Sequence, residues 1–465
     1  IIFSRCKMSY FSLEFSIMMI VFFAVYWAFR ERYLTQNVLV LCFSYLIYIL
    51  INPYFALVLF VYTFFIHYFA LLIFVRQKKN IFMACLAFAI LNLCFFKYFP
   101  SIKDSFDAFL AFFGFGYLNA DIIFPIGISF YTFASITYLV SVYKNKKIET
   151  FLNLATYLSF FPTLLMGPIM RSEFFFEQIH QKREFKNANL IIVLLLFGIV
   201  KKVLIANYLG IYSKEILSNP AAFNFLELLC AIYAFSVQIY CDFSGYVDLV
   251  CAFALMLGFN LPPNFNMPYL SKNLREFWTR WHISLSTFIR DYIYIPLGGS
   301  KKGRMRTYAN LLIAFVLSGI WHGNTLNFFI WGLLHGLGVV FLHLSFVAKR
   351  VNLSKIPYLS TFITFHFITF AWIFFYYPSF AGAAEYLKAC VDNFFMPVEY
   401  KDIYAFAGFG ALFIVYPLFV NFKAHCVKIL SITPLLLKPF ILAFILLLIF
   451  AFMPNGIPQF IYESF

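Results

Sequence analysis

Residues 308–347 have the sequence YANLLIAFVLSGIWHGNTLNFFIWGLLHGLGVVFLHLSFV, which contains three histidines but no Lys, Arg, Asp or Glu. The glycine and asparagine at 323–324 divide it into two apolar runs. The basic loop KKGRMR (301–306) precedes the stretch, and Lys349 and Arg350 follow it. Because basic residues concentrate in cytoplasmic loops, both ends are assigned to the cytosol. The stretch therefore predicts a helical hairpin that enters an apolar medium from the cytosol and turns near residue 322.

The rest of the chain has the same character. Of its 465 residues, 63% are hydrophobic, 23% aromatic and only 12% charged. A soluble globular protein carries about 25% charged residues, so an ordinary soluble enzyme is excluded, and a disordered chain is excluded by the same numbers. We predict an all-α polytopic integral membrane protein with about eleven transmembrane helices plus re-entrant or interfacial helices.

Apolar segments recur along the whole length. They are 13–29, 38–51, 54–75, 81–99, 106–118, 122–143, 151–170, 190–206, 225–240, 243–258, 308–321, 325–346, 356–377, 403–421 and 435–453. Three of them are short or broken by Pro and Gly, and we expect some of these to be re-entrant or interfacial: 106–118, 151–170 and 190–206. No hydrophilic stretch is long enough for a soluble domain, so residues 1–465 are predicted to form one membrane domain.

The net charge is +15, and the basic residues gather in short loops between apolar runs. The positive-inside rule explains this pattern better than nucleic-acid binding, so no nucleic-acid partner is expected. The nine cysteines form no CxxC pair and most lie in apolar runs, so neither a disulfide framework nor a metal site is predicted. The first apolar segment is long and lacks a small-residue cleavage site, so no cleavable signal peptide is expected, and residues 1–7 are taken as an upstream extension before Met8.

The first polar cluster is QIYCDFSGYVDLV (238–250), inside a long apolar run. An ionisable group at membrane depth costs several kcal/mol, so Asp242 and Asp248 should face a bundle interior or an aqueous cavity. Six residues apart, they lie about 120° from sharing a helix face. The cluster is either a buried hydrogen-bond network or part of a site. Gly245 allows either a helix break or the close approach of another backbone.

The second cluster, residues 258–304, coincides with the least hydrophobic region of the chain, about 259–307. Its prolines and asparagines prevent a regular helix at the start. From Leu274 to Tyr294, mixed Arg and aromatic residues predict an amphipathic helix at the cytoplasmic interface. His282 falls at the cytoplasmic surface by this topology, where it either shares the catalytic path or braces that helix. The loop at 298–303 is an ordinary basic turn or a phosphate-holding turn, but not a Walker A sequence.

The third cluster is LSGIWHGNT, which contains His322. A helix starting near Thr307 places His322 about 22 Å along its axis, beyond the middle of a hydrocarbon core about 30 Å thick. An imidazole reached there through a channel can act as a general base near neutral pH. The alternative is a hydrogen-bonded core residue, which is the commoner role of a histidine in an apolar protein. Six other histidines lack a comparable polar neighbourhood and are interpreted as structural: His67, His180, His335, His343, His366 and His425.

Other chemistries lack their motifs in this sequence. It contains no HExxH, Walker A, GxGxxG or CxxC sequence, so zinc peptidase, NTPase and dinucleotide-binding functions have no support. It also contains no GxSxG sequence, which argues against a self-contained hydrolase or esterase.

Five motifs in matching order resemble the membrane-bound O-acyltransferases. They are FYTFASITYLVSVYK (130–144), SFFPTLLMGPIMR (159–171), QIYCDFSGYVDLV (238–250), REFWTRWHISLSTFIRDYIYIPLGG (275–299) and SGIWHG (318–323). The resemblance is strongest to the branch that O-acetylates alginate and peptidoglycan and transfers D-alanine to teichoic acid. It covers about residues 10–460, with a signature core at about 122–346. The chain departs from the family at its end, FIYESF, where members often carry a tail resembling FIYFQF.

The resemblance implies a central funnel, an acyl donor arriving from the cytosol and an essential histidine in the WHG motif, here His322. The family's second signature histidine falls on His282, so these two are the predicted catalytic residues. Supporting positions along the substrate tunnel are expected at Trp281, Trp321, Asp242, Ser244, Tyr240, Gln238 and Arg280. Of these, Trp281 and Arg280 are expected to line the donor entrance together with His282. Weak donor-phosphate contacts are expected from Lys301 and Lys302.

The resulting functional prediction is a membrane O-acetyltransferase of the cytoplasmic (inner) membrane. It takes acetyl from cytosolic acetyl-CoA, a donor substrate and not a bound cofactor, for O-acetylation of an envelope polysaccharide, with peptidoglycan favoured. An extracytoplasmic O-acetyltransferase partner is expected, because the chain has no external catalytic domain. Four alternatives remain: alginate or another exopolysaccharide as acceptor, D-alanyl transfer from a carrier protein, a non-enzymatic transporter or channel, and a non-catalytic scaffold.

Overall fold

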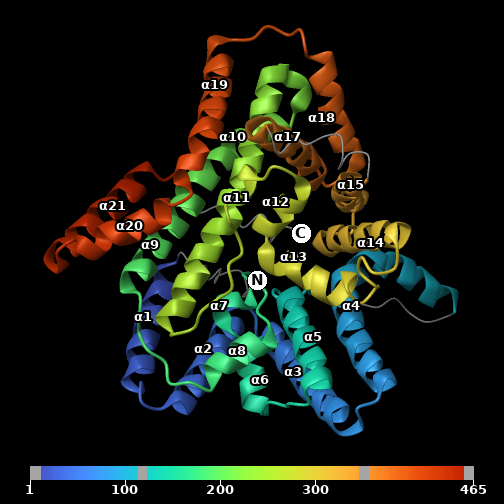
Figure 1. The fold of residues 1–465 in the computed structure, drawn as a ribbon, viewed down its shortest axis with the longest axis vertical. Coiled ribbons are helices and arrows are strands. Elements are labelled where there is room, and N and C mark those ends of the chain that lie inside the picture. The colour runs from blue at the N-terminus through green and yellow to red at the C-terminus, as the bar shows by residue number, and fades with distance from the viewer. Residues whose placement is uncertain (1–11, 114–122, 345–355, 455–465) are drawn as a thin grey trace. The chain divides into compact units, whose positions relative to one another are not determined.

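The computed structural model describes residues 12–113, 123–344 and 356–454, and within these ranges it contains helices and no β-strand (Figure 1). Residues 1–7 and the C-terminal FIYESF, on which two of the expectations above rest, lie outside the described residues. The prediction of an all-α protein is confirmed over the described part of the chain.

Nine helices in the described ranges are long and apolar enough to cross a membrane. They are Tyr33–Ile51, Pro53–Arg76, Lys79–Pro100, Ala188–Leu217, Phe225–Met256, Leu326–His343, Tyr358–Tyr376, Tyr400–Phe419 and Leu435–Phe452. The chain is thus a multi-pass membrane protein, although the expected count of eleven is not confirmed. Residues 190–206, one of the three segments that are short or broken by Pro and Gly, belong to a 30-residue helix whose middle part, Val200–Ala206, is a π-helix.

The chain divides into two compact units, and each is described by itself. The first comprises residues 1–187 and 253–262. Its helices are α1 (Leu13–Ala28), α2 (Tyr33–Ile51), α3 (Pro53–Arg76), α4 (Lys79–Phe112), α5 (Ile128–Asn145), α6 (Phe151–Leu158), α7 (Phe161–Leu164) and α8 (Ser172–Ile179). The segment 151–170 is broken into the short helices α6 and α7, as its Pro and Gly residues predict.

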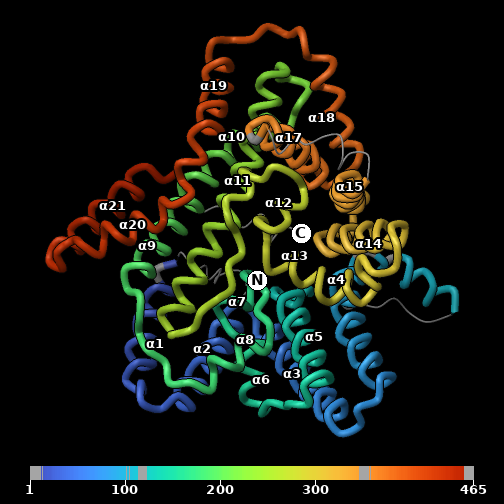
Figure 2. Tube along the Cα trace, in the orientation of Figure 1, coloured from blue at the N-terminus to red at the C-terminus, as the bar shows by residue number. Residues whose placement is uncertain are grey.

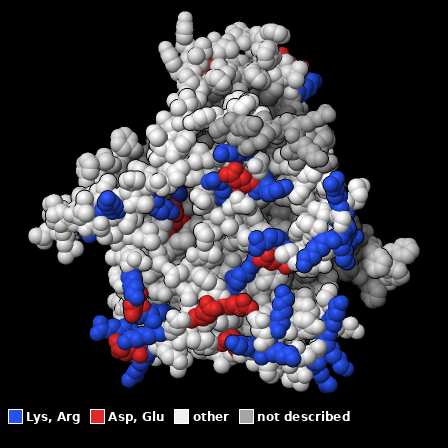
Figure 3. Space-filling view, viewed as in Figure 1, with Lys and Arg blue, Asp and Glu red and all other residues white. Residues whose placement is uncertain are grey.

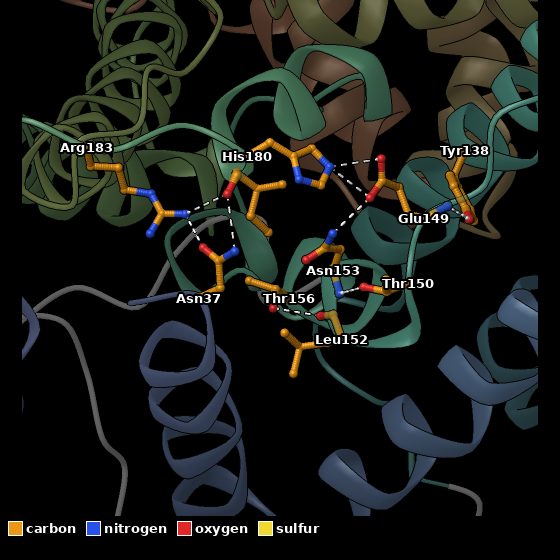
Figure 4. Close-up of polar contacts among 10 residues, drawn as sticks. Asn37, Tyr138, Glu149, Thr150, Leu152, Asn153, Thr156, His180 and Arg183 are labelled. Atoms are coloured by element: carbon orange, nitrogen blue, oxygen red, sulfur yellow. Dashed lines mark hydrogen bonds and ion pairs between the residues drawn. The ribbon is translucent and has the colours of Figure 1, made fainter. Parts of the chain in front are cut away.

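Polar contacts at the end of α8 tie this first unit together (Figure 4). The guanidinium of Arg183 donates to Oδ1 of Asn37 on α2, as Figure 4 shows. It also donates to the hydroxyl of Tyr26 on α1 at 3.1 Å. His180 pairs with the carboxylate of Glu149 at 3.0 Å. These contacts join the loop after α8 to three earlier parts of the chain, and they give His180 a structural partner.

The second unit comprises residues 188–252 and 263–465 and contains every predicted catalytic residue. Its elements are α9 (Ala188–Ile199), the π-helix η1 (Val200–Ala206), α10 (Asn207–Leu217), η2 (Pro220–Ala222), α11 (Phe225–Met256), η3 (Pro268–Leu270), α12 (Leu274–Arg280), α13 (Ile283–Ile289), the π-helix η4 (Arg290–Tyr294), α14 (Arg304–His322), α15 (Leu326–His343), α17 (Pro357–Tyr376), α18 (Phe380–Asp392), α19 (Tyr400–Val415), η6 (Tyr416–Phe419), α20 (Phe422–Ile432), η7 (Leu435–Leu437) and α21 (Lys438–Phe452).

Two glycines let α9 and α11 approach closely. A Cβ atom on Gly245 would lie 3.1 Å from the carbonyl oxygen of Gly198 and 3.2 Å from the backbone nitrogen of Lys202. The helix α11 nevertheless runs without interruption from Phe225 to Met256. Of the two roles that the sequence allows for Gly245, the structure therefore confirms close backbone approach and not a helix break.

The hairpin predicted from residues 308–347 is present as α14 and α15, and the tube in Figure 2 follows the short turn between them. Gly319 on α14 and Gly332 on α15 lie in the interface between the two helices. A Cβ atom on Gly319 would clash with the carbonyl oxygen of Phe328, and one on Gly332 with that of Phe315. The helices therefore pack backbone against backbone, which fixes the end of α14 relative to α15.

The exposed surface suits a lipid environment. Helices α19 and α21 leave most of their apolar side chains exposed, including Phe440, Phe444 and Phe450. On the face drawn in Figure 3, charged side chains form separate groups between broad areas that carry none. A helix that is apolar on its outer face is expected where that face meets lipid.

Candidate active site

His322 is the last residue of α14, and aromatic rings enclose its imidazole. The residue is 5% exposed. Its ring centroid lies 4.6 Å from that of Trp321, 5.1 Å from Trp331 on α15 and 5.2 Å from Phe375 on α17. The ring planes of His322 and Trp331 stand at 86°, which is an edge-to-face contact. Packing from three helices fixes the orientation of this imidazole, as a general base requires.

The second predicted histidine lies at a break in the chain. The prediction of one amphipathic helix from Leu274 to Tyr294 is wrong, because α12 ends at Arg280 and α13 begins at Ile283. Between them His282 adopts a left-handed conformation with φ 41°. Asn264 provides the physical reason: its backbone carbonyl accepts from the N–H of Ile283 at 3.0 Å, which draws that N–H out of a continuous helix.

His282 is 1% exposed, so its imidazole is enclosed by the protein. Its Nδ1 lies 3.2 Å from Oδ1 of Asn264, and its ring packs edge-on against Phe243 at 4.8 Å. Burial lowers the pKa of His282 to about 3, so its imidazole is neutral near pH 7. Its enclosure results from the loop before α12 folding back over the break, a long-range contact that periodicity does not report.

The two histidines flank one indole. The ring centroid of Trp321 lies 6.5 Å from that of His282 and 4.6 Å from that of His322. The structure therefore brings together the two signature motifs, which are separated by 40 positions in the sequence.

An aromatic cluster extends from this point. Trp281, fully buried, lies 6.3 Å from Tyr240 and 5.2 Å from Trp372, measured between ring centroids. Trp372 in turn lies 6.0 Å from Trp331, which contacts His322. The predicted tunnel residues Trp281 and Tyr240 thus belong to the same cluster of rings as His322.

Arg280 makes local contacts instead. Its guanidinium pairs with the carboxylate of Glu276 at 2.8 Å and donates to the backbone carbonyl of Asn266 at 3.2 Å. These contacts brace α12 against the loop before it. They leave the guanidinium partly exposed, with no contact to either histidine among those observed.

Lysines that the sequence reasoning missed neutralise the two aspartates of α11. Asp242 forms an ion pair with Lys202, and both side chains are buried. Asp248 accepts from Lys201 and from Lys423 of α20, each at 2.7 Å. Two adjacent lysines inside the apolar run 190–206 were the available signal, since buried charges are normally paired. Of the two roles left open for these aspartates, this geometry favours the buried network.

Gln238 and Ser244 lie on the same helix in different settings. Oε1 of Gln238 accepts from the hydroxyl of Ser213 at 3.0 Å, which joins α11 to α10. Ser244 is 3% exposed, and its hydroxyl has no hydrogen-bond partner among the described residues. The hydroxyl of Ser244 is therefore a buried polar group without a described partner, whereas the amide of Gln238 holds α11 against α10.

The loop with Lys301 and Lys302 is exposed and contains three glycines with positive φ: Gly298, Gly299 and Gly303. Asn310 of α14 holds it by donating from Nδ2 to the carbonyl oxygen of Gly299 at 3.0 Å. The two lysines therefore extend from an anchored turn directly before α14.

A family model described as membrane-bound O-acyltransferase matches residues 138–383, which include both histidines. That match covers more than half of the chain. The chain belongs to the membrane-bound O-acyltransferase family. It is accordingly an acyltransferase, and the resemblance seen in its motifs is confirmed.

Individual members of this family give finer comparisons. A probable alginate O-acetylase of Pseudomonas syringae pv. tomato is 34% identical over 76% of this chain and 69% of its own length. A peptidoglycan O-acetyltransferase of Helicobacter pylori is 33% identical over 58% of this chain and 57% of its own length. A teichoic acid D-alanyltransferase of Streptococcus thermophilus is 29% identical over 50% of this chain and 59% of its own length.

Proposed function

We propose that this acyltransferase takes acetyl from acetyl-CoA at the cytosolic side of the inner membrane and passes it outward for O-acetylation of an envelope polysaccharide. The observation that carries the proposal is the enclosed imidazole of His322 at the apex of the α14–α15 hairpin, one indole away from His282. The family match and the O-acetylating relatives support acetyl as the group transferred.

His322 acts as the general base in this proposal. Its imidazole takes the proton of the acceptor hydroxyl while the hydroxyl oxygen attacks the carbonyl carbon of the thioester. The new C–O bond forms and the C–S bond breaks. The proton then passes from His322 to the departing sulfur, so that the products are the acetyl ester and the free thiol of CoA, and the enzyme returns to its starting state.

His282 supports this step as a neutral imidazole. Oδ1 of Asn264 also accepts from the N–H of Ser284 at 3.1 Å, so it is an oxygen acceptor and Nδ1 of His282 must be the donor. The lone pair of His282 is then on Nε2, available to a substrate hydrogen-bond donor. A neutral His282 avoids the cost of burying an unpaired positive charge in an apolar site.

Peptidoglycan is the acceptor favoured here, and alginate is the second candidate. The relatives named for these two acceptors are 33% and 34% identical to this chain, so similarity does not separate them. Final transfer to sugar requires an extracytoplasmic O-acetyltransferase partner in this proposal. Incubation of the purified protein and its partner with each polysaccharide in turn distinguishes the two candidates, because only the true acceptor becomes acetylated.

The deciding measurement is turnover of radiolabelled acetyl-CoA by purified protein, with and without the external partner. We expect label to reach the acceptor polysaccharide when the wild-type protein and the partner are both present, and His322→Ala to lower the rate by about 10²- to 10⁴-fold, the usual contribution of a general base. An unchanged rate in a correctly folded His322→Ala variant would remove the catalytic assignment.

Three further outcomes identify the rival functions. Label transfer from a charged carrier protein and not from acetyl-CoA would indicate D-alanyl-type transfer, as in the Streptococcus thermophilus relative. Flux of an acetylated compound into liposomes without any covalent transfer would indicate a transporter. Retained assembly with dispensable His322 would indicate a scaffold.

A further inference from the structure

His335 is a fully buried histidine whose ring nitrogens are not used by the protein. It lies on α15 and is 0% exposed. Neither Nδ1 nor Nε2 has a hydrogen-bond partner among the described residues. The structural role assigned to His335 from the sequence does not explain these two atoms, because buried polar groups in proteins are normally hydrogen-bonded.

Two tryptophans that touch His335 show the same feature. The ring centroid of His335 lies 4.9 Å from that of Trp331 and 5.0 Å from that of Trp278. The buried indole Nε1 atoms of both tryptophans also lack a partner within the described ranges. We call these three residues the His335 cluster. Four unpaired nitrogen atoms therefore occur on three rings in mutual contact.

Packing alone does not account for this cluster. The remaining ring neighbours of His335 are Phe277, Phe315 and Phe367, so a phenylalanine at position 335 would find an aromatic environment. It would also avoid burying two polar atoms without partners. A polar ligand that supplies those partners explains why nitrogen atoms are present here.

The chemistry of the cluster defines the class of ligand. An indole N–H can only donate, so the ligand must present hydrogen-bond acceptors, whereas the imidazole can donate to the ligand or accept from it. Within the described residues no charged side chain forms a hydrogen bond or an ion pair with His335, which favours an uncharged group. Carbonyl or hydroxyl oxygens on a narrow chain meet both conditions.

The cluster adjoins the proposed active site through Trp331. The ring of Trp331 contacts His335 at 4.9 Å and His322 at 5.1 Å. His335 follows the start of α15 by nine residues, about 14 Å along the helix axis, toward the cytosolic end assigned by the basic loops. We propose that the His335 cluster binds the carbonyl- or hydroxyl-bearing chain of a substrate whose reacting group lies at His322. This inference rests on the proposed function.

Equilibrium binding to the purified full-length protein tests it directly. The probes are acetyl-CoA, whose chain carries amide carbonyls, and an oligosaccharide of the acceptor, which carries hydroxyls. We expect His335→Phe to raise the Kd of one probe about tenfold, a change of about 1.4 kcal/mol, and the affected probe identifies the source of the oxygen atoms. His335→Gln, which can still donate and accept, should bind within about threefold of wild type.

Trp278→Phe is the second variant, since it removes only an indole N–H and keeps an aromatic ring. It should weaken binding of the same probe even where His335→Phe does not accumulate. His67→Phe on α3 is the matched control, because His67 also has a buried Nδ1 without a partner among the described residues. Its Kd values should equal those of the wild type.

The outcomes separate this inference from the proposed function. Wild-type Kd values for both probes in His335→Phe and Trp278→Phe would overturn the inference, as would a wild-type protein that binds neither probe. Transfer of label that does not depend on His322 would overturn the proposed function, while the Kd comparison would still decide the role of the His335 cluster. A higher Tm in His335→Phe with unchanged binding would mark His335 as a packing residue only.

Discussion

Nδ1 of His282 donates to Oδ1 of Asn264 across 3.2 Å in an environment that excludes water. The same oxygen accepts from the N–H and the hydroxyl of Ser284, at 3.1 and 2.7 Å. Asn264 therefore fixes the tautomer of His282 and the fold of the α12–α13 break with one amide group. Orientation of a histidine through the hydrogen bond of its second nitrogen is a recurrent device in catalytic and metal sites.

Asn264→Asp is expected to make activity depend on the protonation of His282. A carboxylate at this position would favour the imidazolium and raise the pKa of His282 from about 3 toward the physiological range. The rate should then fall as the pH decreases from 8 to 6, while the wild-type rate shows no titration of His282 in that interval. Rate profiles of the purified variants measure this, with Asn260→Asp, an exposed position, as control. Superimposable profiles for wild type and Asn264→Asp would contradict the proposed role.

The lowered pKa of His282 also predicts how stability changes with pH. Between about pH 6.5 and 3 the unfolded chain binds a proton on this residue and the folded chain does not, so acidification favours unfolding. The expected loss is about 1.4 kcal/mol per pH unit below 6.5, and none arises from this residue above that pH. Tm in detergent at pH 7.5, 6 and 5 should fall less steeply for His282→Asn than for wild type. Parallel slopes would show that His282 is protonated in the folded protein.

Much of this molecule follows from its sequence because the bilayer restricts the choices. The lengths of the apolar segments and the positions of the basic loops predict an all-α fold and the α14–α15 hairpin with His322 at its end. Contacts between residues far apart in the sequence could not be predicted in this way. The break at His282 depends on Asn264, and the neutralisation of Asp248 depends on Lys423, 175 positions away. Helical periodicity reports which face of one helix is apolar, but not which distant polar group will meet it.

Removing one partner of the buried Lys202–Asp242 pair should destabilise the protein, whereas replacing both partners by apolar residues should not. Asp242→Asn leaves a lysine charge in an apolar interior without its counter-charge, which typically costs about 3–5 kcal/mol. The double variant Asp242→Leu with Lys202→Met removes both charges and should recover most of the loss. Thermal unfolding in detergent measures all three proteins. A double variant as unstable as the single one would indicate that the pair has a role beyond charge compensation.

Lys301 and Lys302 should affect the capture of an anionic donor more than its chemistry. They extend from an exposed turn, so their attraction for phosphates is screened by salt and modest in size. Substitution of both by Gln is expected to raise KM for acetyl-CoA by a few-fold at low ionic strength, leave kcat unchanged, and lose its effect near 0.5 M salt. A fall in kcat with unchanged KM would place these lysines in the chemical step instead.

Gly319 sets the distance between the two helices that carry the active site. Because a Cβ atom there would meet the backbone carbonyl of Phe328, the helices must separate to admit Gly319→Ala. Overpacking of this kind costs about 1–3 kcal/mol, and it would displace His322 from the rings that hold it. We therefore expect a lower Tm together with a loss of kcat, because misplacement by about 1 Å can cost 10²-fold in rate. Gly408→Ala on α19 is the control: no atom lies within 4 Å of a Cβ there, so it should be neutral or slightly stabilising. Equal Tm and kcat values for Gly319→Ala and wild type would show that close contact between α14 and α15 is not needed to position His322.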